Sequence, residues 1–128
     1  MHQDLKPHNF FVFQEDDTII AKIGDCDSVV EENSPKSCST EGYLAPELQA
    51  IGRVTKATDI YAMGICLWHI LGPLIIDSPT LVSPKLGPIE IKALRNLVLR
   101  MKDPEPTKRP TAAGAKAIIA YVLRRIPP

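Results

Sequence analysis

Four polar side chains near the start of the chain are of types that can accept a proton, offset the charge of a bound anion or bind a cation. Asp4, Lys6 and Asn9 lie close together in the sequence, and Asp25 follows further along. A carboxylate can orient a hydroxyl group and accept its proton, and an ammonium group offsets negative charge. Amide and carboxylate oxygens are the ligands that hard divalent cations prefer. On a tight loop, the first three side chains can converge on one anionic group.

The residues between Asn9 and Asp25 predict a β-hairpin. Two runs rich in aromatic and β-branched residues, 10–13 and 18–23, flank the acidic segment 14–17, which is the pattern of two strands and a turn. In an antiparallel pair, the outer ends of the strands lie side by side. The hairpin therefore brings Asn9 and Asp25 to one edge, although the pattern itself does not require a metal there.

The rest of the chain predicts mainly helices. Residues 26–42 are polar, are interrupted by Ser, Pro and Gly, and indicate a surface loop. Residues 59–71 are apolar nearly all round and predict a buried helix, with Thr58 as its N-cap. Residues 72–87 hold three prolines and resist a helical assignment, whereas an Ala-rich helix is expected over 111–124. Helical spacing marks one more segment, with apolar positions Ile91, Leu94, Leu97, Val98 and Met101.

Length and composition exclude several classes of function. A chain of 128 residues is long enough for one domain and too short for two. Fifteen basic and fifteen acidic residues balance, so we expect neither a nucleic acid nor a membrane as a partner. Three cysteines without metal-ligand spacing favour reduced thiols and an intracellular, cytoplasmic location. No apolar run approaches the roughly 20 residues of a membrane span.

Five motifs in order resemble the second half of a protein kinase domain. Residues 2–9, HQDLKPHN, resemble the catalytic loop H-R-D-x-K-x-x-N. Residues 22–27 stand where that family has a strand running into D-F-G, and residues 40–47 end in A-P-E. Residues 59–64 and 108–111 resemble the later D-x-x-x-x-G and R-P-T. The resemblance implies an α+β, protein kinase-like fold, of which residues 1–128 would be a partial domain without the N-terminal lobe. This part would be mainly α-helical, with one small β-hairpin at its N-terminal end.

The resemblance implies a protein serine/threonine kinase that uses ATP and magnesium on a protein substrate. Asp4 would be the catalytic base or hydroxyl-orienting group, and Lys6 would offset charge on the moving phosphate. Asn9 and Asp25 would be magnesium ligands, and Thr40 would line the floor under the acceptor hydroxyl. Each residue also has a plain structural reading: a capping or turn-forming Asp or Asn, a solvated Lys, or a loop Thr.

The same resemblance implies three supporting residues. Asp59 would reach back to the backbone of the catalytic loop and hold it rigid. Arg109 would pair with Glu47 in a partly buried, bidentate contact that fixes the substrate loop to the helices. None of the three is expected to contact substrate.

Departures from the family pattern leave a second reading open. Gln3 stands where many members have an Arg that holds a phosphorylated loop, and glutamine cannot form that charge-assisted pair. Cys26 and Asp27 replace Phe-Gly, and the chain contains no G-x-G-x-x-G. Alone, the chain is therefore expected to be a very poor kinase. The alternative is a non-catalytic kinase-like binding or scaffold module, a pseudokinase fragment whose exposed cleft a partner covers. A third reading is a fragment that neither folds nor acts.

Overall fold

The computed structural model describes residues 1–72 and 85–127, which form a hairpin and a helical body. The expected fold class, mainly helical with one small antiparallel hairpin, is confirmed. Short 3-10 turns occur at Pro7–Asn9, Cys26–Ser28 and Pro106–Lys108. The strands and helices are β1 Phe10–Glu15, β2 Thr18–Ile23, α1 Pro46–Ile51, α2 Lys56–Gly72, α3 Pro88–Met101 and α4 Ala112–Arg125.

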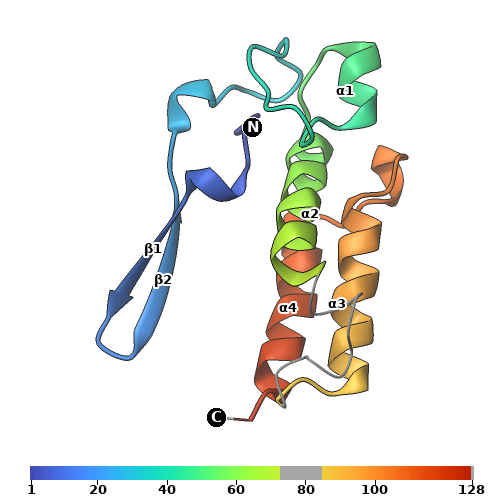
Figure 1. Ribbon diagram of the computed structural model, residues 1–128. Helices are drawn as coiled ribbons and strands as arrows, with labels where there is room; N and C mark the ends of the chain where they lie inside the picture. The colour runs from blue at the N-terminus through green and yellow to red at the C-terminus, as the bar shows by residue number, and fades with distance from the viewer. Residues whose placement is uncertain (73–84, 128) are drawn as a thin grey trace.

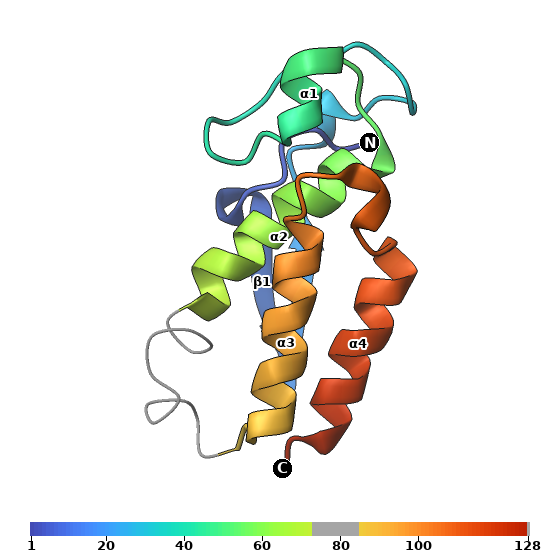
Figure 2. The ribbon, with the colours of Figure 1, turned by 90° about the vertical axis from the view of Figure 1, so that its right-hand side faces the viewer.

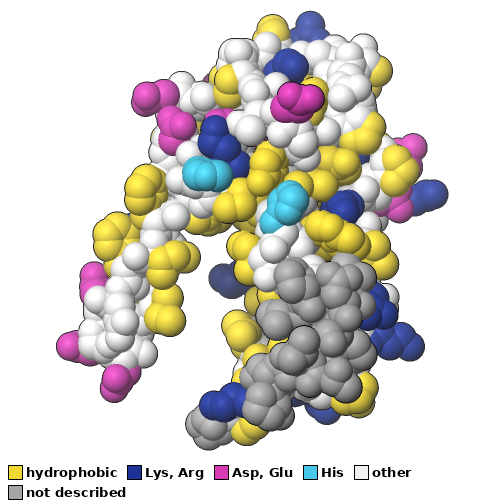
Figure 3. Space-filling view, viewed as in Figure 1, with side chains coloured by type: hydrophobic (Ala, Val, Ile, Leu, Met, Phe, Trp, Pro, Cys, Tyr) yellow, Lys and Arg dark blue, Asp and Glu magenta, His cyan; other side chains and the backbone are white. Residues whose placement is uncertain are grey.

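The hairpin projects away from the helices (Figure 1). Phe10 pairs with Ile23, and the N–H of Gly24 donates to the carbonyl of Asn9 at 2.9 Å, which closes the open end of the hairpin. The predicted juxtaposition of the two strand ends is therefore present. Apolar side chains of the hairpin remain in contact with solvent (Figure 3), including Val12 and Ile19, which are 67% and 73% exposed.

Helices α2, α3 and α4 lie side by side (Figure 2) and form most of the core. The backbones of α2 and α3 approach closely, because a Cβ built on Gly64 would lie 2.8 Å from the Cβ of Met101. A side chain at position 64 would force these helices apart. The buried apolar residues of these three helices are Ala62, Cys66, Leu94, Leu97, Val98, Met101, Ala115 and Val122.

The expected N-cap of α2 is wrong. The helix begins at Lys56, and Thr58 is a buried residue within it. The Oγ1 of Thr58 accepts the N–H of Thr55 at 3.2 Å and donates to the Thr55 carbonyl at 2.7 Å. Thr55 is thus the N-cap of α2. Thr58 is at the third helical position, where a capping box often has Glu, and accepts the N–H of the N-cap residue in the same way.

The other helical expectations agree with the structure, with one omission. The segment spaced by Ile91 and Met101 is α3, and the Ala-rich segment is α4, whose N-cap Thr111 accepts the N–H of Gly114. Helix α1 was not anticipated. The expectation for residues 72–87 falls largely on 73–84, which lie outside the described residues. Among residues 1–72 and 85–127, no helix is long and apolar enough to cross a lipid bilayer.

The three thiols differ in exposure, which gives a direct test of the packing of α2. Cys66 is fully buried, and burial raises the pKa of its thiol to about 11. Cys26 is exposed and Cys38 is half-buried. Since the thiolate is the reactive form, we expect two thiols to react with a disulfide reagent at pH 8 in the native protein. The third should react only on unfolding, and a Cys66→Ala variant should show the same two native thiols. Equal rates for all three would show that α2 is not buried.

Candidate active site

Asp4, Lys6 and Thr40 form one hydrogen-bonded cluster between the loop of residues 2–9 and the loop that precedes α1. The Nζ of Lys6 donates to Oδ2 of Asp4 at 2.7 Å and to Oγ1 of Thr40 at 3.0 Å. The hydroxyl of Thr40 donates to the other carboxylate oxygen, Oδ1. These residues are 36 positions apart in sequence at the extremes, so the fold brings together three of the side chains that the sequence singled out.

The surroundings of Asp4 favour its ionised form. Burial by itself raises the pKa of this carboxyl, but the hydrogen bonds from Lys6 and Thr40 outweigh burial and hold the pKa below its ordinary value of 3.8. The pKa of Lys6 is raised, first by its hydrogen bond to Asp4 and further by the charge of Asp25. At neutral pH the cluster therefore holds an oriented carboxylate beside an ammonium group.

Asn9 and Asp25 lie at the open end of the hairpin, next to this cluster. The side-chain Nδ2 of Asn9 donates to the carbonyl of Asp4 at 2.8 Å, which leaves its Oδ1 as the available acceptor. Asp25 has φ +58°, and its side-chain carboxylate accepts no hydrogen bond from the part of the chain that the structure describes. One amide oxygen and one free carboxylate suit magnesium, which usually takes one or two protein carboxylates together with phosphate oxygens and water.

The backbone of residues 2 and 3 is held by Asp59 from the first turns of α2. Its two carboxylate oxygens accept the N–H groups of His2 at 2.7 Å and Gln3 at 3.0 Å. The imidazole Nε2 of His2 also donates to the carbonyl of Gly24 at 3.0 Å. The loop that carries Asp4 is thereby tied both to the helical body and to the residue before Asp25.

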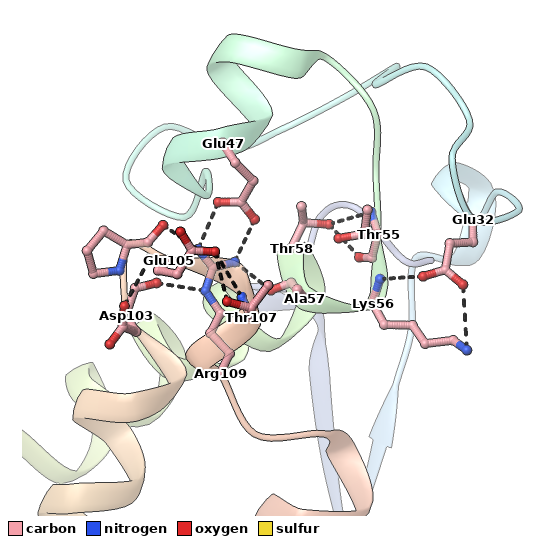
Figure 4. Close-up of polar contacts among 11 residues, drawn as sticks. Glu32, Glu47, Thr55, Lys56, Ala57, Thr58, Asp103, Glu105, Thr107 and Arg109 are labelled. Atoms are coloured by element: carbon pink, nitrogen blue, oxygen red, sulfur yellow. Dashed lines mark hydrogen bonds and ion pairs between the residues drawn. The ribbon is translucent and has the colours of Figure 1, made fainter.

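Arg109 joins three segments of the helical body through a buried guanidinium group (Figure 4). It meets Glu47 in a bidentate pair, with Nη1 to Oε1 at 2.6 Å and Nη2 to Oε2 at 2.8 Å. Further bonds reach the carbonyls of Ala57 and Asp103, each at 2.8 Å. The side chain of Arg109 is only 1% exposed and lies over the ring of Tyr61. The contact that the sequence resemblance implied is therefore present.

One residue has contacts that the sequence did not predict. Gln3, noted only because it is not arginine, is buried and hydrogen-bonds to Ser28 and Ser37. These partners lie 25 and 34 residues away in sequence. No local pattern of residues signals such a contact, because it depends on how residues 28–37 fold back on residues 2–9.

Comparisons with known proteins agree on one family. Residues 1–120 match the family described as protein kinase domain. The serine/threonine-protein kinase plk-1 of Caenorhabditis elegans is 30% identical over 126 residues, covering 88% of this chain and 19% of that protein. The serine/threonine protein kinase ypkA of Aspergillus fumigatus is 31% identical over 135 residues, covering 94% of this chain and 21% of that protein.

A third relative matches a shorter stretch. The receptor-like kinase TMK4 of Arabidopsis thaliana is 40% identical over 79 residues, covering 56% of this chain and 8% of that protein. The chain spans about a fifth or less of the length of these curated relatives.

Proposed function

This chain belongs to the protein kinase family, and we propose that it is part of a protein serine/threonine kinase domain that transfers the γ-phosphate of ATP to a protein hydroxyl. The observation that carries the proposal is the cluster of Asp4, Lys6 and Thr40 beside Asn9 and Asp25. It supplies a carboxylate for the acceptor hydroxyl, a cation for the phosphate and oxygens for a metal. Those are the protein groups that phosphoryl transfer uses on this side of the nucleotide.

Asp4 is the residue that we assign to the acceptor hydroxyl. Its lowered pKa keeps the carboxyl ionised at neutral pH, so it can accept a hydrogen bond from the hydroxyl and orient the oxygen toward phosphorus. A strong base is not required, because most of the catalysis in phosphoryl transfer comes from positioning and charge stabilisation. The ammonium group of Lys6 and the hydroxyl of Thr40 now donate to the carboxylate of Asp4. With a substrate bound, these two donors would turn partly toward the substrate.

Lys6, Asn9 and Asp25 deal with the charge of the phosphates. Lys6 carries a positive charge within 2.7 Å of the carboxylate of Asp4, in reach of a phosphate placed beside it. The amide oxygen of Asn9 and the carboxylate of Asp25 would hold magnesium. When bound with ATP, magnesium neutralises part of the negative charge on the phosphates.

Serine or threonine is the acceptor that we propose, rather than tyrosine. Lys6 is two residues after Asp4, the spacing that accompanies Ser/Thr substrates in this family, and in this chain it also hydrogen-bonds to Thr40. The relatives plk-1 and ypkA are themselves named serine/threonine kinases. Use of ATP and the three free thiols favour an intracellular location.

Residues 1–128 are, in this proposal, a partial kinase domain that runs from the catalytic loop to the last helices. They include no glycine-rich phosphate loop, so within this chain ATP would be held from one side only. We expect the 128-residue chain on its own to transfer phosphate poorly.

The test is phosphate transfer by the full-length protein, with ATP and magnesium, to matched peptides that differ only in a central Ser, Thr or Tyr. We expect phosphoserine or phosphothreonine, and loss of transfer when magnesium is chelated. Asp25→Asn should need a higher magnesium concentration for half-maximal transfer than the exposed control Asp16→Asn. Phosphotyrosine alone would overturn the acceptor assignment. No transfer to any peptide or protein acceptor would leave a non-catalytic binding module as the better description.

A further inference from the structure

The side-chain amide of Gln3 joins the catalytic loop to two segments that flank the site. Its Nε2 donates to the carbonyl of Ser28, and to Oγ of Ser37 at 3.2 Å. Its Oε1 accepts the backbone N–H of Ser37 at 3.0 Å. Gln3 is 8% exposed, so water competes little for these bonds.

Both partners of Gln3 lie close to residues of the proposed site. Ser28 follows the segment that begins with Asp25, and Ser37 precedes Thr40, whose hydroxyl bonds to Asp4. A single side chain therefore bonds residues 2–9 to both the segment 25–28 and the segment 37–40, in addition to the bonds of His2 to Gly24 and of Thr40 to Asp4 and Lys6.

The backbone of Gln3 is also held in a demanding conformation. Its φ is +71°, in the left-handed region that non-glycine residues seldom adopt. Its N–H is bound to Asp59 at 3.0 Å. Strained residues persist where the surrounding contacts determine them, and they concentrate at functional sites.

The loop is fixed before Ser37 by a separate set of bonds. Residues 33–36 pair with residues 52–54 through an isolated bridge between Pro35 and Arg53, with Val54 N–H to the Ser34 carbonyl at 3.0 Å. The Gln3 bonds extend this attachment to Ser37, whose backbone N–H donates to the side chain of Gln3. Among the bonds of the described residues, the other ones that tie this stretch to residues 2–9 are those of the Thr40 hydroxyl to Asp4 and Lys6.

We infer that Gln3 is a positioning residue, which places the substrate segment against the catalytic loop through neutral hydrogen bonds and without a phosphate. The inference rests on the proposed function, because the position of Thr40 matters only if Asp4 and Lys6 act on a substrate. An amide both donates and accepts, whereas glutamate only accepts and arginine only donates. Neither replacement can therefore make the complete set of bonds to Ser28 and Ser37.

The first experiment measures the loop and needs no activity. Residue-specific amide exchange at Ser37 and tryptic cleavage after Lys36 are followed in the full-length protein. In Gln3→Arg, which lacks the acceptor, exchange at Ser37 should rise about ten-fold, the effect of losing one buried hydrogen bond. In Gln3→Glu the N–H keeps its acceptor, so Ser37 stays protected. Cleavage after Lys36 should quicken in Gln3→Arg and stay near the rate of the unaltered protein in Gln3→Glu, since proteolysis tracks the same local opening.

Matched controls come from Gln49, which is exposed on α1. Gln49→Arg and Gln49→Glu make the same changes of charge and should alter neither exchange at Ser37 nor cleavage after Lys36. An unchanged exchange rate at Ser37 in Gln3→Arg would overturn the inference.

A second experiment separates this inference from the proposed function. For peptide phosphorylation, Gln3→Arg should lower kcat/KM about ten-fold or more, because small displacements of positioning groups are costly, with the KM for ATP unchanged. Phosphatase treatment should change neither Ser37 exchange nor activity in the unaltered protein. A loosened loop with full peptide activity would refute the positioning role. Absence of all transfer would refute the proposed function, while Ser37 exchange would still decide whether Gln3 holds the loop.

Discussion

Asp4→Asn is expected to lower kcat for peptide phosphorylation by about 100- to 10,000-fold, the range that a positioned acid–base group supplies. Asparagine keeps the size of aspartate but loses its charge. It can no longer accept hydrogen bonds at both oxygens, as Asp4 now does from Lys6 and Thr40. The KM for ATP should change little, because the nucleotide is held by other groups.

The measurement is steady-state transfer of labelled phosphate by the full-length protein and its variants. Asp17→Asn, in the exposed turn of the hairpin, is the matched control and should retain the activity of the unaltered protein. Thermal unfolding checks that Asp4→Asn remains folded. If it folds and keeps at least half of the activity, Asp4 does not have the role that we assign to it.

The lowered pKa of Asp4 determines how activity and folding stability should depend on pH. Because the pKa of Asp4 is lowered, its carboxyl is ionised throughout the neutral range, and its titration should not limit activity there. A depressed pKa in the folded state adds stability above the unfolded value of 3.8, and this contribution is lost as pH falls through the folded pKa.

Arg109→Ala is expected to lower the free energy of unfolding by about 3–5 kcal/mol, the usual effect of removing one partner of a buried ion pair. The change leaves the carboxylate of Glu47 without its two bonds and frees the carbonyls of Ala57 and Asp103. In chemical denaturation this should appear as a lower midpoint at an unchanged slope.

Two variants make the result specific to the contacts of Arg109. Arg109→Lys keeps the charge but loses the planar fork, so its stability should lie between those of the alanine variant and the unaltered protein. Arg124→Ala, on the exposed side of α4, should stay within about 0.5 kcal/mol. An Arg109→Ala variant as stable as Arg124→Ala would mean that the pair with Glu47 contributes nothing net.

Much of the frame of the site could be predicted because local patterns determine it. The β-branched and aromatic runs around residues 14–17 fix the hairpin, and antiparallel pairing then brings Asn9 beside Gly24 and Asp25. The contact between Glu47 and Arg109 came instead from the family resemblance, since nothing in the spacing of two residues 62 apart requires them to meet.

The features that the sequence did not predict correctly, which are helix α1, the N-cap of α2 and the contacts of Gln3, have different physical causes. Helix α1 is only six residues long, too short for a hydrophobic period, although Pro46 at its first position and Gly52 after its end are signals that could have identified it. Thr58 was mistaken for a cap because Thr55 and Thr58 are both capping residue types, and burial decides between them. The contacts of Gln3 depend on tertiary folding alone.

The start of α2 has a consequence for how the protein responds to thermal motion. Asp59 holds the backbone of residues 2 and 3, while Ala57, two residues earlier, is bound by the guanidinium that also binds Glu47 in α1. Both attachments belong to one helical turn, so a shift of this helix end along its axis moves both together. Such a shared displacement changes the separation between residues 2–9 and α1 less than independent motions of the two segments would.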